Sequence, residues 1–284
     1  MQNKDLKFVF FGTPDVANET LEILKQNGYV PELIITAPDR PQGRKMILTP
    51  PPVKVWAIEN NIPYIQPENL KELSFPEVRL RGNSPKSDFG ETDLFIVVAY
   101  GKILPEELIK LPKHGSMNIH YSLLPKYRGA SPVESAILTG DKETGITIQQ
   151  MEYKMDAGPI IAKEIVPIQD DEKAPDLRKR LIKIGGELLV KTLPDFIEGK
   201  INPIPQNEEE ATFCKKIKKE DGLIDLSGDA IKNYNKFRAY ANWPRTFFFK
   251  DGKRIIITGA KLENGVFIIN KVIPEGGKEI EYKN

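Results

Sequence analysis

Asn118 and His120 stand two residues apart, and their side chains could do chemistry together. The run from Met117 to His120 predicts a short strand, in which residues two apart project from the same face. An amide can stabilise a developing oxyanion and an imidazole can move protons, a combination that suits acyl transfer. The alternative is purely structural: Asn118 ends the strand and His120 satisfies a loop backbone.

Two further segments extend this pair. The run Ser122-Leu123-Leu124-Pro125-Lys126-Tyr127-Arg128-Gly129 follows it directly, and Asp156 stands in a loop after an alternating strand at 145–151. A carboxylate on a loop beside a histidine can orient the imidazole and favour its charged form. An Asp before a small residue and a Gly is also typical of a simple turn.

The strands and helices that must position these residues alternate along the chain. Apolar runs at 7–11, 33–37 and 94–99 predict buried strands, and further strands are expected at 117–120, 145–151 and 160–168. Apolar residues at helical spacing predict helices at 18–26, 53–60, 132–139 and 177–197. This alternation predicts an α/β fold, a Rossmann-like and mostly parallel sheet with helices on both faces. Ligands bind at the carboxyl ends of strands in such sheets, which is where Asn118 and His120 are expected.

A boundary follows the longest helical pattern. Residues 202–206 are proline-rich and 208–210 are acidic, after which short strands with glycine turns begin. We predict a catalytic domain at 1–200, a linker at 201–210 and a small C-terminal β-barrel, OB-like, at 211–284. Residues 75–92 are expected to be irregular.

Composition narrows the chemistry. Cys214 is the single cysteine and the chain has two histidines, which excludes an intrachain disulfide and disfavours a metal enzyme, so no metal is expected. The short apolar run after the polar N-terminus predicts neither a signal peptide nor a membrane span, and we expect a cytoplasmic protein. The net charge of +1 divides into −5 for residues 1–210 and +6 for 211–284, so the C-terminal region is suited to a nucleic acid.

Taken together, the motifs resemble the folate-dependent formyltransferases. The resemblance rests on Asn118-Ile119-His120, on Ser122 to Pro125 with Arg128-Gly129, and on Asp156 about one strand later. Such enzymes use an Asn, a His and an Asp, with 10-formyltetrahydrofolate as formyl donor. The resemblance implies that Asn118, His120 and Asp156 are catalytic. The family continues a little further than Asn284, so the last barrel element is expected to be missing or shortened.

The resemblance also implies how the donor is held and used. The pterin is expected in a mostly apolar slot. The residues expected around it are Val97, Val98, Tyr100, Leu104, Ser122, Leu123, Leu124 and Pro125. A free amine would attack the formyl carbon directly through a tetrahedral species. Asn118 would donate to the oxyanion, His120 would assist proton transfer to the leaving nitrogen, and Asp156 would orient His120.

Several segments resemble the branch of this family that formylates the methionine carried by initiator tRNA. They are Phe10 to Pro14, Pro38 to Arg44, Pro52 to Lys54, Val97 to Gly101, Gly140 to Gly145 and Asn242 to Pro244. Residues 40–54 contain four cations and no acid, and we interpret them as a basic loop, not a helix, that reaches a nucleic acid. The tRNA contacts are expected at Arg40, Arg44, Lys45, Lys215 and Lys216, with Phe237 and Trp243 largely in the core.

Two other functions remain open on the sequence. An aminosugar N-formyltransferase would use the same folate donor and the same trio, but it would not need the basic segment 40–54. A nucleic-acid-binding protein with a degenerate catalytic domain would not need an intact Asn118, His120 and Asp156. We expect a monomer that binds initiator methionyl-tRNA and the folate co-substrate and no membrane.

Overall fold

The structure is a computed structural model that describes residues 6–43, 45–70 and 92–282. The irregular stretch predicted at 75–92 lies outside the described residues except for Thr92, and so does Arg44. The chain divides into two compact units. The first consists of Met1–His120, Ile146–Glu164 and Ile182–Asn207, and the second of Tyr121–Gly145, Ile165–Leu181 and Glu208–Asn284. The predicted boundary at 201–210 stays a prediction.

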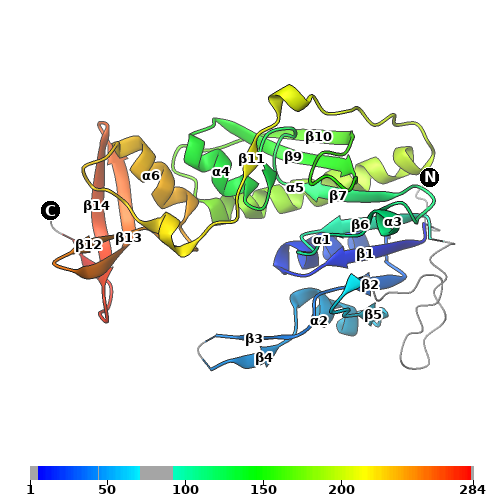
Figure 1. The fold of residues 1–284 in the computed structure, drawn as a ribbon, viewed down its shortest axis with the longest axis horizontal. Coiled ribbons are helices and arrows are strands. Elements are labelled where there is room, and N and C mark those ends of the chain that lie inside the picture. The colour runs from blue at the N-terminus through cyan, green and yellow to red at the C-terminus, as the bar shows by residue number, and fades with distance from the viewer. Residues whose placement is uncertain (1–5, 44, 71–91, 283–284) are drawn as a thin grey trace. The chain divides into compact units, whose positions relative to one another are not determined.

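A mostly parallel sheet is the framework of the first unit (Figure 1). Its seven strands follow the order β10-β9-β7-β6-β1-β2-β5. Their bounds are β1 Phe8–Gly12, β2 Leu33–Ile35, β5 Tyr64–Ile65, β6 Leu94–Val98, β7 Ser116–His120, β9 Glu143–Gln150 and β10 Ile160–Pro167. All pairings from β5 through β7 are parallel, and β9 runs antiparallel to β7. This confirms the predicted α/β class.

The strand order reverses direction between β1 and β6. From β1 the chain adds β2 and β5 on one side, then crosses over to add β6 and β7 on the other. Such a switch point opens a crevice at the carboxyl ends of the two strands. The Thr13 hydroxyl, just after β1, donates to the Tyr100 carbonyl, just after β6, at 3.0 Å. Ala99 and Gly101 beside it have φ of +46° and +83°, so the chain turns sharply where β6 ends.

Helices cover both faces of this sheet. The first unit contains α1 (Asp15–Gln26), α2 (Pro52–Glu59) and α3 (Glu106–Ile109), and α5 (Ala174–Ile197) contributes its later turns. Leu108 and Ile109 of α3 pack in one cluster with Phe11 and Phe95. Alternation places Phe10 on the opposite face, where Phe10 and Ala17 of α1 both approach Gly12. A side chain at Gly186 of α5 would collide with Ile23 of α1, so those two helices pack closely.

The basic segment 40–54 is more ordered than expected. Strands β3 (Arg40–Gln42) and β4 (Ile47–Thr49) form an antiparallel hairpin that extends away from the sheet in Figure 1. The interpretation of the whole segment as a loop that cannot be a helix was wrong, because Pro52 begins α2 and Lys54 lies within it. Proline at the first helical position loses no hydrogen bond and has the right φ, so the prolines start this helix.

The second unit is built on an antiparallel sheet. Strands β12 (Phe247–Lys250), β13 (Lys253–Glu263), β14 (Val266–Pro274) and β15 (Ile280–Glu281) pair in sequence order. Helix α6 (Ala230–Ala239) covers it, and Phe237, Phe248, Ile257 and Val272 form the core between them. The remaining elements are α4 (Pro132–Thr139), β8 (Arg128–Gly129), β11 (Phe213–Cys214) and 3-10 turns at Glu208–Glu210 and Lys219–Gly222. The C-terminal antiparallel domain is confirmed, and closure into a barrel stays a prediction.

The two aromatic residues expected in this core differ in how far they are buried. Phe237 is buried, as predicted. The prediction for Trp243 was wrong, because 54% of its surface is exposed. Trp243 follows α6 rather than lying on its inner face, so the core formed by α6 and the sheet does not enclose it.

Candidate active site

Strand β7 places Asn118 and His120 at its carboxyl end. Asn118 is opposite Val97 of the parallel strand β6 and opposite Gln149 of the antiparallel strand β9. His120 is opposite Thr147. The strand predicted from the sequence is therefore present, and its pleat puts the amide and the imidazole on one face.

Asp156 reaches the same site from the loop between β9 and β10. Its Oδ1 lies 3.7 Å from Nδ1 of His120, and the two side chains are 17% and 7% exposed. That separation is an ion-pair distance, longer than a hydrogen bond. Catalytic hydrogen bonds are often long before substrate binds and shorten in the complex. The carboxylate that the sequence places some 36 positions downstream of His120 is thus brought beside it.

The backbone of this loop is held in an uncommon conformation. Asp156 has a φ of +51°, in the left-handed region that few residues other than glycine adopt. The side chain of Gln206 donates to the carbonyls of Asp156 and Gly158 at 2.9 and 2.7 Å. Gly158 is required because a Cβ there would meet the Gln150 carbonyl at 1.8 Å. These contacts fix the position of the Asp156 carboxylate.

Gln149 is a site residue that sequence reasoning missed. Its Nε2 donates to Asn118 Oδ1 at 3.2 Å and to Asp156 Oδ1 at 3.1 Å, so one amide group joins two members of the trio. The alternating pattern of strand 145–151 was the available signal, since it puts Gln149 on one face with Thr147. Only the β7–β9 register shows that this face meets Asn118.

The Asn118 amide has a defined orientation. Its Nδ2 donates to the Val97 carbonyl at 3.0 Å, while its Oδ1 accepts from Gln149. An amide nitrogen carries two hydrogens, so one N–H of Asn118 remains for another acceptor after the Val97 contact. Asn118 is half-buried, which strengthens any hydrogen bond it makes to a developing negative charge.

Four of the residues predicted to contact the donor lie in or after β6. Val97, Tyr100 and Leu104 belong to one buried cluster, and Val98 is also buried. The Tyr100 hydroxyl is buried and has no hydrogen-bond partner among the described residues. Burial raises the pKa of Tyr100 to about 12, so this hydroxyl stays neutral and can donate. The Gln149 Oε1 atom is buried and unpartnered in the same way.

The other four predicted donor contacts belong to the second unit. Ser122 donates from its hydroxyl to the Lys126 carbonyl at 2.6 Å, and the Pro125 carbonyl accepts from Thr212 N at 3.2 Å. Ser122, Leu124 and Pro125 are buried, and Leu123 is half-buried. The structure therefore brings Asn118, His120 and Asp156 together within the first unit, and the complete donor slot stays a prediction.

Arg128-Gly129, part of the same motif, has a structural role in the second unit. Arg128 is fully buried and forms a two-pronged ion pair with Glu208, at 2.7 and 3.1 Å. Gly129 has a φ of +118°, and a Cβ there would meet the Cys214 carbonyl at 2.3 Å. These two residues therefore hold β8 against β11.

The predicted tRNA contacts are exposed but differ in their partners. Arg40 pairs with Glu68 at 2.7 Å, although both side chains are more than 60% exposed, so the pair is weak and easily exchanged. Lys45 lies in the exposed turn of the β3–β4 hairpin. Lys215 and Lys216 follow β11 and are exposed. Neither lysine has an ion-pair partner within the described part of the chain.

Within residues 6–43, 45–70 and 92–282, no group of three or more His, Cys, Asp or Glu side chains could hold a metal ion. None of the helices in the same ranges is long and apolar enough to cross a membrane.

Two family models match this chain. The formyl transferase family matches residues 6–193, and the C-terminal domain of formyl transferases matches residues 216–281. The chain therefore belongs to the formyl transferase family, as its motifs predicted. Asn118, His120 and Asp156 all lie inside the first match.

Within the family, the chain is similar to methionyl-tRNA formyltransferases. It is 43% identical over 256 residues to that of Halalkalibacterium halodurans, a match that covers 90% of this chain and 78% of the relative. Two solved structures show the fold alone. WlaRD, a sugar 3N-formyl transferase solved with dTDP and 5-N-formyl-THF, has a TM-score of 0.70 at 21% identity, covering 98% and 97% of the two chains. The methionyl-tRNA formyltransferase of Clostridium thermocellum has a TM-score of 0.60 at 19% identity, covering 98% and 100%.

Proposed function

We propose that this protein transfers the formyl group of 10-formyltetrahydrofolate to the α-amino group of the methionine carried by initiator tRNA, for translation initiation. The observation that carries the reaction type is the meeting of Asn118, His120 and Asp156 at the end of β7. The 43% identity to a methionyl-tRNA formyltransferase supports the acceptor. The aminosugar alternative rests on likenesses in fold at about 20% identity, which do not select a substrate.

The reaction requires one bond to form and one to break. The uncharged amine attacks the formyl carbon, a C–N bond forms, and the carbonyl oxygen becomes an oxyanion. The bond from that carbon to the folate nitrogen then breaks, the amine loses a proton and the folate nitrogen gains one. Asn118 donates its remaining N–H to the oxyanion, a contact that strengthens as charge develops there.

His120 and Asp156 assist the two proton transfers of the reaction. His120 supports the oxyanion and assists proton transfer to the leaving nitrogen, and Asp156 orients it through Nδ1. Asp156 also holds a water that carries away the proton of the amine. Gln149 positions both Asn118 and Asp156 through its Nε2. The unpartnered Tyr100 hydroxyl and Gln149 Oε1 are suited to polar atoms of a bound heterocycle.

The basic residues bind the acceptor in this proposal. Arg40 and Lys45 on the hairpin, with Arg44 in the same segment, and Lys215 with Lys216 contact tRNA phosphates. Phosphate contacts position a nucleic acid without reading its sequence. They should therefore govern tRNA affinity and leave the folate step unchanged.

The experiment is a formyl-transfer assay with purified protein and 10-formyltetrahydrofolate. The acceptor is either methionyl initiator tRNA or an amino-dideoxy-sugar nucleotide, and transfer to the tRNA alone is expected. Asn118→Ala should lower kcat about 100- to 1000-fold, the cost of one oxyanion donor. A fall of less than tenfold would remove Asn118 from the mechanism. Formylation of the sugar nucleotide in preference to the tRNA would reject the proposed acceptor.

A further inference from the structure

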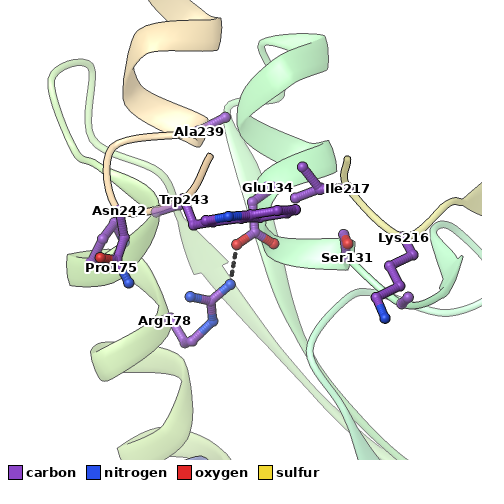
Figure 2. A pocket seen from close by; sticks show the side chains of 11 residues that line it. Ser131, Glu134, Pro175, Arg178, Lys216, Ile217, Ala239, Asn242 and Trp243 are labelled. Carbon is purple, nitrogen blue, oxygen red and sulfur yellow. Dashed lines mark hydrogen bonds and ion pairs between the residues drawn. The ribbon is translucent and has the colours of Figure 1, made fainter. Parts of the chain in front are cut away.

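A cavity of about 270 Å³ lies wholly within the second unit (Figure 2). Its walls come from the start of α4, the start of α5, the segment after β11 and the segment after α6. The polar and aromatic side chains that line it are Ser131, Glu134, Arg178, Lys216, Asn242 and Trp243. Apart from the exposed Lys216, none of these residues has a part in the mechanism above.

Trp243 supplies an aromatic surface at this cavity. Figure 2 shows its indole seen edge-on, lying flat above the carboxylate of Glu134. With 54% of the residue exposed, much of a large apolar ring faces solvent. Large aromatic side chains that remain accessible beside polar groups are typical of binding surfaces, and every nucleobase can stack on such a face.

Glu134 supplies a buried acceptor below the ring. Its side chain is 10% exposed and pairs with Arg178, which is 37% exposed. The pair fixes the carboxylate through Oε1, while a carboxylate has two oxygens and about four acceptor sites. The remaining capacity suits an N–H donor, such as the exocyclic amino group of adenine or cytosine. Guanine carries such an amino group as well, whereas uracil has none and offers a single N3–H between two carbonyl oxygens that a carboxylate repels.

Lys216 supplies a cation at the rim of the cavity. Its side chain is exposed, and within the described part of the chain it forms no ion pair. A lysine beside a stacking surface is the arrangement expected where a phosphate follows a stacked base. Ser131 adds a hydroxyl at the same wall.

We propose that this cavity binds one unpaired nucleotide of the tRNA whose base carries an exocyclic amino group. The base stacks on Trp243, its amino group donates to Glu134, and its phosphate contacts Lys216. This inference rests on the proposed tRNA acceptor and extends it from phosphate contacts to a specific subsite for a base. Because the subsite adds affinity for the tRNA, its loss should raise the KM for tRNA and leave the KM for the folate donor unchanged.

The binding test uses tryptophan fluorescence and needs no activity. The chain has two tryptophans, and Trp56 is buried with its indole N–H bonded to Glu22. In a Trp56→Phe protein, Trp243 is therefore the single tryptophan, and its emission is excited selectively at wavelengths that tyrosine does not absorb. The probes are the single-stranded RNAs CACCA and UUUUU. Saturable quenching by CACCA, with weaker quenching by UUUUU, is expected. Absence of quenching by CACCA, or equal quenching by both, overturns the proposal.

The kinetic test separates this proposal from the proposed function. Trp243→Ala should raise the KM for methionyl-tRNA about 5- to 160-fold, the range for one lost base–aromatic stack, and Trp243→Phe should restore most of it. Phe249→Ala is the matched control, since Phe249 is an equally exposed aromatic on β12 that does not line the cavity. If the unaltered protein formylates tRNA and Trp243→Ala keeps its KM, the subsite is refuted while the function stands. If the unaltered protein formylates no tRNA, the proposed function fails first.

Discussion

Replacing Gln149 by Met tests whether the amide that joins Asn118 to Asp156 positions the trio. Methionine has nearly the length and volume of glutamine, so the strand and its packing are kept. It removes the donors of two hydrogen bonds, at 3.2 Å to Asn118 and 3.1 Å to the Asp156 carboxylate. It also removes the buried Oε1 atom, which has no partner among the described residues.

The expected loss of rate follows from these contacts. A neutral hydrogen bond contributes about 0.5–1.5 kcal/mol and one to a charged group about 1.5–3 kcal/mol. Asn118 keeps its Val97 contact and the Asp156 backbone keeps Gln206, so part of the geometry survives. We therefore expect the barrier to rise by about 1.4–2.7 kcal/mol, which is a 10- to 100-fold fall in kcat with KM values little changed.

Stability should change far less than activity. A buried acceptor without a partner costs about 1–3 kcal/mol, and its removal offsets the two lost hydrogen bonds. The Tm of Gln149→Met should accordingly stay within a few degrees of the unaltered protein. Gln150→Met is the matched control, because Gln150 is the neighbouring residue on β9 and faces the other side of the sheet.

A second substitution at this position gives a readout that packing alone would not change. Gln149→Glu puts a second carboxyl group beside Asp156 in place of a donor. Like charges raise the pKa of a carboxyl group, so the acid limb of the kcat–pH profile should move to higher pH. The assay is formyl transfer to methionyl-tRNA at saturating donor from pH 5 to 9. If Gln149→Met keeps kcat within twofold, or Gln150→Met loses as much, the positioning role is refuted.

Two further predictions concern stability. Gly129→Ala should lower Tm by several degrees, since it combines a φ of +118° with a Cβ only 2.3 Å from the Cys214 carbonyl. Gly199→Ala, at a φ of +70° with open space around it, should lower Tm less, and an equal effect would contradict the steric argument. The pKa of His114 is lowered mainly by burial, so the unfolded chain binds its proton more readily and stability should rise between about pH 5 and 7. Tm measured across that range should be flatter in His114→Gln, and an unchanged slope would assign the pH dependence to other groups.

Much of the framework is readable from residue patterns. The apolar runs at 8–12 and 94–98 are buried along their whole length, because central parallel strands are covered on both faces. Helix α4 begins and ends at the residues where proline and glycine signals predict, Pro132 and Thr139 before Gly140. These features depend on neighbours in sequence, and local patterning is sufficient to predict them.

The segment from Arg40 to Lys54 shows where local reading failed. Its prolines suggest an irregular loop, but Arg40 and Gln42 pair with Thr49 and Ile47 in a hairpin. The end of the segment belongs to the helix expected at 53–60, which is present as α2. The prediction that Trp243 is largely buried was wrong for a related reason. The hydrophobicity of a side chain does not show whether other residues cover it. In both cases the outcome depends on what packs against the residue.

The sequence by itself determined six of the seven strands of the main sheet, most helices, the formyl transferase motif and the presence of Asn118, His120 and Asp156. Tertiary structure alone decided that Asp156 lies 3.7 Å from His120 and that Gln149 joins Asp156 to Asn118. It also decided that Trp243 lies over Glu134 and Arg178 at a cavity. The physical reason is that strand register and loop conformation set these distances, and both arise from hydrogen bonds between residues far apart in the chain.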